Sequence, residues 1–323
     1  MKLTAREQEI LDILRKEPLI SQEELADRLH ITRSSAAVHI SNLMKKGIIL
    51  GKGYVINERV TCLVIGEACL QTEVVSHNPE IRITDRFAGF GFETVRSLCR
   101  FGLKVRWIGL VGSDDEGSRM LEPLQRLGAD LNLVERSINT ATTRTVRILE
   151  DDRASAYRSG FLDDDLVSLA RSREWAIDEA DWLMIQPNLI GRLAAAVPSV
   201  KKHRQIVTGI ASGELEQMPE ELGLAHVLVV NGASIQDSMD AIHARWPNGG
   251  PTHMIYTDGR YSVTVESPQG NYEMGIPPAH GFEHKEASAD FVSGVVNGLA
   301  AGYPVRQAVR IGIGAAVSRT EPS

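Results

Sequence analysis

Residues 28–57 combine side chains that bind phosphates with a complete lack of acidic residues. Every acidic residue among the first 57 lies at or before Asp27. Such segregation places a positive surface on one part of a small domain, as contact with a nucleic-acid backbone requires. The alternative interpretation of this stretch is a charged, solvent-exposed face that binds no ligand. The basic residues of this stretch are Arg28, Arg33, Lys45, Lys46 and Lys52.

A second group of polar side chains falls on one expected helix, from Thr32 to about Lys46. Guanidinium, hydroxyl, imidazole and amide groups reach phosphates and base edges in a DNA groove. Val38, Ile40 and Leu43 are expected to be the buried residues of this helix. The polar positions are occupied by Arg33, Ser34, Ser35, His39 and Asn42.

Two further helices and a hairpin are expected to position this surface. Thr4 and Glu7 have the spacing of a capping box that begins a helix, and Ser21 repeats that spacing with Glu24. The segment IILGKGYVIN, residues 48–57, predicts a β-hairpin with a lysine at its tip. This order of elements resembles the winged helix-turn-helix of bacterial regulators, which implies binding to duplex DNA. A winged helix that binds protein is the alternative.

The length of 323 residues predicts two unequal domains, residues 1–57 and 58–323. Nine basic and seven acidic residues give the first a net charge of +2; since the whole chain carries −7, the remainder carries −9. The negative charge of the whole chain argues against a protein that coats nucleic acid along its length. Three unevenly spaced cysteines argue against a disulfide framework and favour a cytoplasmic location. No apolar run approaches the roughly 18 residues of a membrane span, so no membrane partner is expected.

The second segment alternates apolar strands with helical stretches, which predicts an α/β domain with a mainly parallel sheet flanked by helices. Its first expected strand is TCLVIGEACL, residues 61–70. Residues 142–158 predict two antiparallel strands that turn at Asp151 and Asp152, a candidate lid. Helices are expected in residues 94–102 and 121–131, strands in residues 104–112, 180–187, 204–210, 225–231 and 252–259, and a hairpin in residues 261–278.

The order of these elements resembles the ribokinase-like family, also called phosphofructokinase-B carbohydrate kinases. Similar landmarks run from about Val60 to the C-terminus. The most recognisable is GLVGSDDEGSRMLEPLQRLGADL, residues 109–131, where family members carry VGxDxxGxxxxxxLxxxGV. The two-part layout is similar to that of bacterial members with an N-terminal winged helix, among them relatives of pseudouridine kinase.

The resemblance implies phosphoryl transfer from ATP, with Mg²⁺, to a hydroxyl of a sugar or nucleoside. It places the general base at Asp290. In relatives the preceding residues usually read Gly-Ala-Gly and donate backbone N–H groups to the phosphoryl charge. Here they are Ala287, Ser288 and Ala289, whose methyl groups hinder a close approach of the backbone to phosphate. An acidic helix residue without chemistry is the alternative interpretation of Asp290.

The substrate positions that the resemblance implies are altered as well. Gln71 stands where relatives carry an aspartate that holds substrate hydroxyls. In the substrate motif before the next helix, Gly89 is retained, whereas Glu93 replaces an asparagine.

The implied nucleotide positions are retained only in part. Asn231 keeps the first residue of an NxxE motif that organises magnesium and phosphate, but Ser234 replaces its glutamate. Thr257 and Gly259 keep part of a nucleotide loop, and Asp258 between them adds a negative charge.

Arginines of the candidate lid either contact an anionic ligand or are surface charges, and surface charges are the favoured interpretation. They are Arg144, Arg147, Arg153 and Arg158. The histidines form no pair at metal-ligand spacing, so no tightly bound metal is expected.

Two functions of different classes fit these patterns. The first is a DNA-binding protein fused to a sugar or nucleoside kinase, with Asp290 as general base. The second is a ligand-responsive transcription regulator whose kinase-like domain binds a sugar or nucleoside and transfers phosphate slowly or not at all; the altered motifs favour it. A homodimer is expected because regulators of this type read paired half-sites.

Overall fold

A computed structural model describes residues 4–16, 20–45, 61–77, 80–150, 153–196, 205–247, 249–277 and 285–318. The chain divides into two compact units, Met1–Arg59 and Val60–Ser323. The domain boundary expected after residue 57 and the hairpin expected at residues 48–57 lie outside the described residues.

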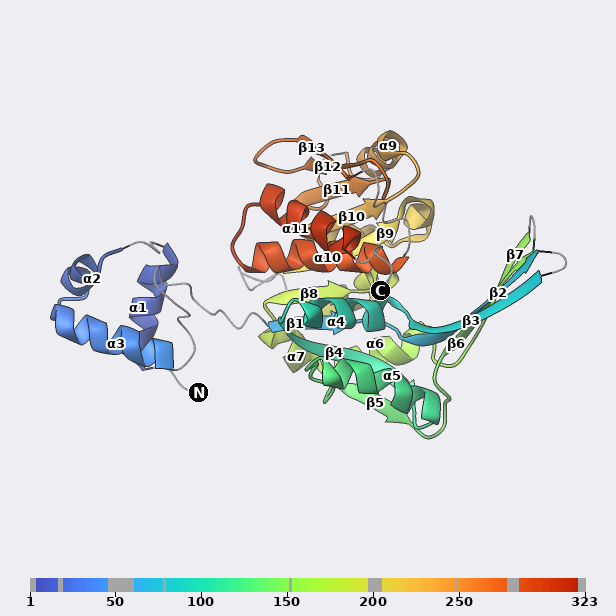
Figure 1. Cartoon of the computed structure of the whole chain (residues 1–323), viewed down its shortest axis with the longest axis horizontal. Helices are drawn as coiled ribbons and strands as arrows, with labels where there is room; N and C mark the ends of the chain where they lie inside the picture. Colours follow the sequence, from blue (N-terminus) through green and yellow to red (C-terminus); the bar gives the residue numbers. More distant parts are fainter. Residues whose placement is uncertain are drawn as a thin grey trace. The chain divides into compact units, whose positions relative to one another are not determined.

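Helices make up the described part of the first unit (Figure 1). The Thr4 hydroxyl accepts the N–H of Glu7 at 3.2 Å, and the Glu7 carboxylate accepts the N–H of Thr4 at 2.7 Å. Ser21 and Glu24 form the same reciprocal pair. Both expected capping boxes are therefore confirmed. The helices are α1 (Ala5–Lys16), α2 (Gln22–Arg28) and α3 (Arg33–Lys45).

Helix α3 begins as expected, because the Thr32 hydroxyl accepts the N–H of Ser35 at 3.2 Å. The expectation that Val38 is buried is wrong: it is 58% exposed. Ala36 is buried instead, since its spacing of four residues to Ile40 places both on the face toward α1 and α2. The core of this unit consists of Ile10, Leu14, Ile20, Leu25, Ile40 and Leu43.

Nine described strands of the second unit form one sheet in the order β13-β12-β11-β10-β9-β8-β1-β4-β5. Every pairing from β11 to β5 is parallel, and β12 and β13 add antiparallel strands at one edge. The expected mainly parallel sheet is confirmed. The strands are β1 (Thr61–Ile65), β4 (Lys104–Gly112), β5 (Val134–Ser137), β8 (Trp182–Ile185), β9 (Gln205–Ala211), β10 (Val227–Asn231), β11 (His253–Thr257), β12 (Ser262–Glu266) and β13 (Tyr272–Gly275).

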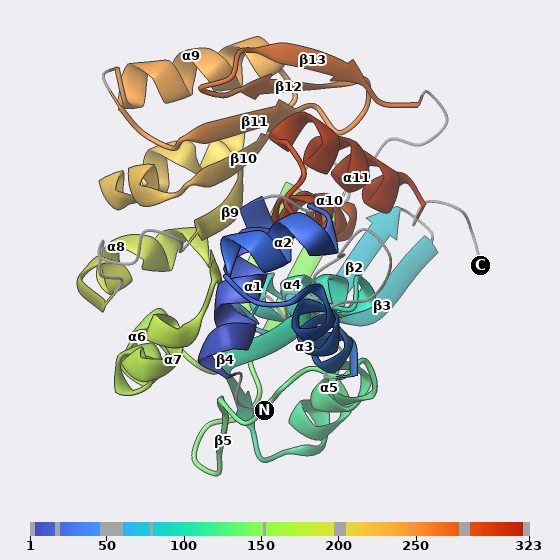
Figure 2. The same ribbon diagram turned by 90° about the vertical axis from the view of Figure 1, so that its left-hand side faces the viewer.

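Helices cover both faces of this sheet, as Figure 2 shows. In β1, Cys62 and Val64 join the core on one face, while Leu63 and Ile65 join the core on the other. A strand buried on both sides reads as a continuous apolar run, which explains why the sequence predicts it. One face is covered by α4 (Phe90–Arg100), α5 (Asp115–Arg126), α10 (Lys285–Ala300) and α11 (Val305–Val317), the other by α6 (Asp163–Ser172), α7 (Glu174–Glu179), α8 (Ile190–Leu193) and α9 (Ile235–Arg245).

A second sheet, which we call the lid, extends away from the larger one (Figure 1). Its strands are β3 (Glu80–Ala88), β2 (Cys69–His77), β6 (Arg144–Glu150) and β7 (Arg153–Ser159), in that order. The antiparallel pair β6 and β7 confirms the strands expected in residues 142–158. The strand expected at residues 61–70 is instead two strands, because the chain leaves β1 at Ile65 and enters the lid at Cys69.

Candidate functional site

A cleft of about 1230 Å³ opens where the parallel strands end. Glu67, Gln186, Asn231 and Asp258 line it, and each follows or ends a different strand of the large sheet. The lid and the first residues of α4 and α10 supply further walls. The carboxyl ends of parallel strands are the usual place for a ligand in an open α/β sheet, so this cleft is the candidate site.

The loop after β1 touches the start of α4 backbone to backbone. The N–H of Gly91 donates to the Glu67 carbonyl at 2.7 Å. Gly89 has φ +105°, and a Cβ on it would lie 2.7 Å from the same carbonyl oxygen. Only glycine combines this backbone conformation with this closeness, which gives a physical reason for Gly89. Glu67 and Glu93, on the two sides of this junction in the chain, both line the cleft.

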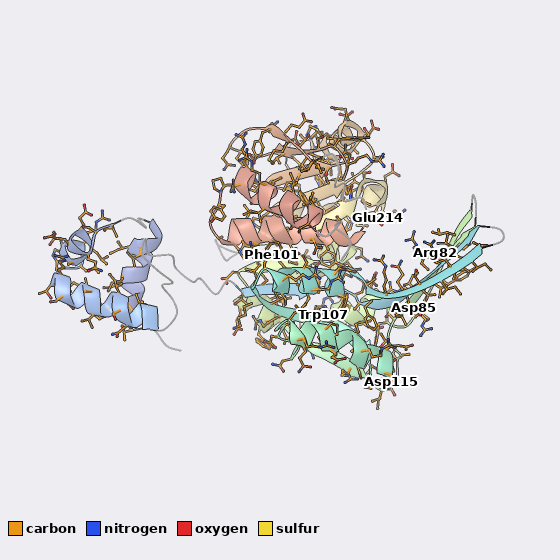
Figure 3. The ribbon with its side chains drawn as sticks, viewed as in Figure 1. Arg82, Asp85, Phe101, Trp107, Asp115 and Glu214 are labelled. Carbon is orange, nitrogen blue, oxygen red and sulfur yellow. The ribbon has the colours of Figure 1, made fainter. Side chains whose placement is uncertain are left out.

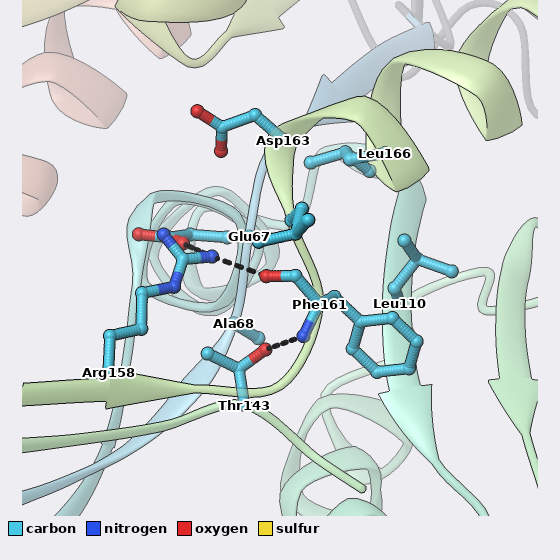
Figure 4. Close-up of a pocket in the computed structure, with 9 residues that line it drawn as sticks. Glu67, Ala68, Leu110, Thr143, Arg158, Phe161, Asp163 and Leu166 are labelled. Carbon is cyan, nitrogen blue, oxygen red and sulfur yellow. Dashed lines mark hydrogen bonds and ion pairs between the residues drawn. The ribbon is translucent and has the colours of Figure 1, made fainter. Parts of the chain in front are cut away.

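The base of the lid is fastened to the body by polar contacts (Figure 4). Arg158 of β7 forms an ion pair with Glu67 at 2.7 Å and donates to the Phe161 carbonyl at 3.0 Å. The N–H of Phe161 donates to the Thr143 hydroxyl at 3.2 Å. The ion pair joins the hairpin to the loop after β1, and the Phe161–Thr143 bond joins the two ends of the hairpin to each other.

Asp114, in the most recognisable segment of the sequence, ties α5 to the lid. Its carboxylate caps α5 by accepting the N–H of Gly117 at 2.8 Å, and it accepts the N–H and hydroxyl of Thr142 at 2.7 and 2.6 Å. Burial disfavours its charge, but these bonds outweigh burial and lower the pKa of Asp114. Thr142 precedes β6, so the capped helix fixes where this lid strand starts.

All three expected substrate residues, Gln71, Gly89 and Glu93, line the cleft. Gln71 is 8% exposed, and its Oε1 accepts a hydrogen bond from Arg86 at 3.3 Å. Its Nε2 has no partner among the described residues. Glu93 is buried and ion-paired with Arg96, one turn further along α4.

Of the three expected nucleotide residues, Asn231 lines the cleft, whereas Thr257 and Gly259 shape the loop after β11. Asn231 lines the cleft at the end of β10. Thr257 is buried, its hydroxyl donating to the Ser262 carbonyl at 3.1 Å and accepting the N–H of Gly259 at 3.0 Å. Gly259 has φ +69°. Asp258, between them, does line the cleft.

Two side chains near the nucleotide positions are committed to local structure. Burial disfavours the charge of Asp258, but N–H groups of Arg260, Tyr261 and Ser262 donate to its Oδ1 and lower its pKa. Ser234, in the position of the motif's glutamate, caps α9 by accepting the N–H of Asp237 at 3.2 Å. Both side chains therefore hold local backbone structure in place.

Asp290 lies in α10 and is 4% exposed. It is not among the described residues that line the cleft, whereas Ser288, Ala289 and Val292 are. At 100° per residue the aspartate points away from the face that these three share. Because α10 begins at Lys285, only the Ala287 amide among the three expected donors belongs to the unpaired N–H groups at the helix start.

The expected DNA-binding residues that the structure describes lie on α3. Arg33 and Ser34 are exposed, and Ser35 and His39 are half-buried. Exposed Val38 adds an apolar side chain to this surface. Lys45 ends the helix, while Lys46 and Lys52 lie outside the described residues.

Several cleft residues were missed by sequence reasoning. Arg86 comes from the lid, Asn188 follows β8, and Arg260 and Tyr261 follow β11. Arg147, for which a surface charge was the favoured interpretation, lines the cleft as well, and it alternates with apolar residues along its strand. The described residues contain no group of three or more histidine, cysteine, aspartate or glutamate side chains that could hold a metal ion. No helix among them is long and apolar enough to span a membrane.

Comparisons with known proteins agree with this division of the chain. The family described as winged helix-turn-helix DNA-binding matches residues 3–49. The uncharacterized sugar kinase YeiI of Escherichia coli (strain K12) is 26% identical over 353 residues, covering 98% of this chain and 94% of that protein.

Solved structures of the ribokinase type resemble the second unit. Arabidopsis thaliana ribokinase complexed with ribose and ATP aligns with a TM-score of 0.62 and 16% identity, covering 82% of this chain and 94% of that chain. A PfkB protein from Polaromonas sp. JS666 gives 0.61 and 16%, covering 82% and 97%. The second unit therefore has the ribokinase-like fold. The chain therefore combines a segment that matches winged helix-turn-helix DNA-binding domains with a second unit of the ribokinase-like fold.

Proposed function

We propose that the protein is a ligand-responsive DNA-binding regulator, in which the cleft of the kinase-like domain binds a sugar- or nucleoside-like ligand without depending on phosphoryl transfer. The observation that carries this proposal is the position of Asp290, buried in α10 and turned from the cleft. A general base must come within hydrogen-bond reach of the proton it removes. The altered motif supports the same conclusion, because Ser234 replaces its glutamate and the Oδ1 of Asp258 already accepts three backbone N–H groups.

The experiment compares ligand binding with turnover. Thermal shifts and ADP release are measured on the full chain with ATP and a panel of sugars and nucleosides. Stabilisation without ADP release is expected, and Asp290→Asn should leave that stabilisation nearly unchanged because no proton has to move. ADP release that Asp290→Asn lowers by a factor of about a hundred to ten thousand would reject the proposal.

A kinase is the second candidate, favoured by similarity to a sugar kinase over nearly the whole chain. In it, Asp290 would take the proton of a substrate hydroxyl, whose oxygen attacks the γ-phosphorus of ATP while ADP leaves. Asn231, which lines the cleft, would offer an amide oxygen to the hydrated magnesium that accompanies ATP. The double variant Ala287→Gly, Ala289→Gly tests it, because it frees the backbone before Asp290 without adding charge. Turnover that appears only in this variant would mean that the alanines block an otherwise competent site.

Binding to duplex DNA is supported by the exposed polar surface of α3 and by the family match. Salt dependence tests it, because each lost phosphate contact reduces the slope of log K against log salt by about 0.9. Arg33→Ala with Lys52→Ala should flatten this slope on genomic fragments by about 2. Arg6→Ala, which removes an exposed charge of α1 paired with Glu9, is the control and should leave the slope unchanged. An equal slope in all three proteins would refute the assignment.

We also expect a homodimer. Residues two apart on a strand share a face, so Ile81 and Ile83 of β3 lie together on the lid face opposite the cleft, at 68% and 65% exposure. Tyr157 of β7 is exposed on the same face by its register. An apolar sheet face of this kind suits a second copy of the chain, which would also pair two DNA-binding segments.

A further inference from the structure

The lid presents a row of hydrogen-bond donors to the cleft. The strand register aligns Gln71 of β2 with Arg86 on β3 and with Thr145 on β6. Arg147 lies two residues beyond Thr145 and therefore on the same face. All four line the cleft. Figure 3 shows Arg82 and Asp85 on opposite sides of the lid, as this alternation requires.

Positive charge dominates this wall. Among the described lid residues, Arg86 and Arg147 are the charged side chains that line the cleft. Four carboxylates outside the lid also line the cleft, those of Glu67, Glu93, Glu214 and Asp258, and two of them are paired with arginines, Glu67 with Arg158 and Glu93 with Arg96. Glu73 does pair with Arg147, but at 3.5 Å and with both side chains partly exposed, a geometry that contributes little.

Cys69 adds no negative charge to the wall. It lines the cleft at the start of β2. Burial raises the pKa of its thiol, and the charge of Glu67 raises it further, so the sulfur stays protonated at neutral pH. The positive charges of Arg86 and Arg147 are therefore not neutralised by a thiolate at Cys69.

Gln71 points to the identity of the missing acceptor. Its side chain is more than nine-tenths buried, it lines the cleft, and its Nε2 has no hydrogen-bond partner among the described residues. A buried N–H group without a partner is costly, so such a group in a ligand cleft indicates an acceptor supplied by the ligand. Its Oε1 holds Arg86, which fixes the guanidinium beside this amide.

We propose that the ligand of this cleft carries an oxyanion, a phosphate monoester or a carboxylate, that accepts hydrogen bonds from Gln71, Arg86 and Arg147. Guanidinium groups present paired N–H donors that match two oxygens of such a group. An aspartate at position 71 would repel it, whereas the amide donates to it. This inference rests on the proposed function, because it requires that the cleft bind a ligand.

The test uses matched compounds on the full chain, measured by calorimetry at low salt. Each set contains a neutral compound, its phosphate monoester and its acid, built on ribose, glucose and uridine. At least one anionic compound should bind more than tenfold tighter than its neutral parent, and comparing the ester with the acid identifies which oxyanion the site takes. Arg86→Gln and Arg147→Gln should each weaken that binding roughly tenfold to a hundredfold.

Arg82→Gln is the matched control. It removes the same charge from the same strand and face as Arg86, but Arg82 does not line the cleft, so affinity should change less than twofold. Gln71→Asp should weaken the anionic compound at least tenfold more than its neutral parent.

Neutral compounds that bind as tightly as anionic ones would overturn the inference and leave the proposed function standing. Equal losses in Arg82→Gln and Arg147→Gln would also overturn it, because general charge rather than the site would then attract the ligand. If no compound of any set binds, both the inference and the proposed function fail.

Discussion

Replacing Gly89 by alanine isolates the contact that joins the loop after β1 to α4. The residue has φ +105°, and an added Cβ would lie 2.7 Å from the Glu67 carbonyl oxygen and 2.9 Å from the Cα of Ala68. Both neighbours are backbone atoms of the cleft wall, so they cannot move away as a flexible side chain would. The substitution therefore combines an unfavourable backbone conformation with an enforced displacement.

The two effects can be separated by control variants. Gly102→Ala has φ +75° with open space around the new Cβ, so it measures the cost of a positive φ without a close contact. That effect is about 1–2 kcal/mol, offset by about 0.4–1 kcal/mol from the lower entropy of the unfolded chain. Gly89→Ala adds overpacking of about 1–3 kcal/mol. We expect a loss of about 2–4 kcal/mol for Gly89→Ala and about 1 kcal/mol for Gly102→Ala in the free energy of unfolding.

Urea unfolding of the full chain, followed by the fluorescence of its four tryptophans, measures both losses. Gly91→Ala completes the comparison, because its Cβ would overlap the Gly66 carbonyl oxygen without a positive φ. A Gly89→Ala protein no less stable than Gly102→Ala would refute the reasoning, since the close approach would then carry no cost.

Ser234→Ala should lower the free energy of unfolding by about 1 kcal/mol in urea, because α9 loses its cap, whereas Ser234→Asp keeps a capping oxygen and should be nearly neutral. Burial lowers the pKa of His226 and His253, the latter further through its neighbour's charge. The unfolded chain therefore binds more protons than the folded one below about pH 6.5, and Tm should fall as the pH is lowered through that value, less steeply in His253→Phe. Ile83→Lys should shift sedimentation from dimer to monomer, while Thr84→Lys, on the other face of β3, should not; a monomer in the parent protein would contradict the dimer.

The sequence predicts the strands of the large sheet well because they are buried on both faces. The strand expected at residues 104–112 is β4, with the same bounds. The lid strands β2 and β3 escaped prediction for the opposite physical reason. One of their faces lines the cleft and the other is exposed, so Arg82, Thr84 and Arg86 interrupt the apolar residues and leave only a weak alternation.

The site was predictable by residue type and much less by geometry. Gln71, Gly89 and Asn231 were named from their motifs and line the cleft. The orientation of Asp290 depends on where α10 begins, which local sequence does not determine. Arg86 is brought beside Gln71 by strand register, and register follows from the whole sheet rather than from either strand alone.

Asp114 connects the helix α5 to the lid strand β6 through a single carboxylate. Its carboxylate caps the first turn of α5 and also holds Thr142, the residue two positions before β6 begins. The same side chain therefore joins a helix that covers the large sheet to a strand of the lid. A screen for alleles that no longer respond to ligand should therefore recover Asp114 substitutions alongside changes in the cleft. Their carriers would still make the protein, and the defect would trace to a misplaced lid strand instead of to a lost ligand contact.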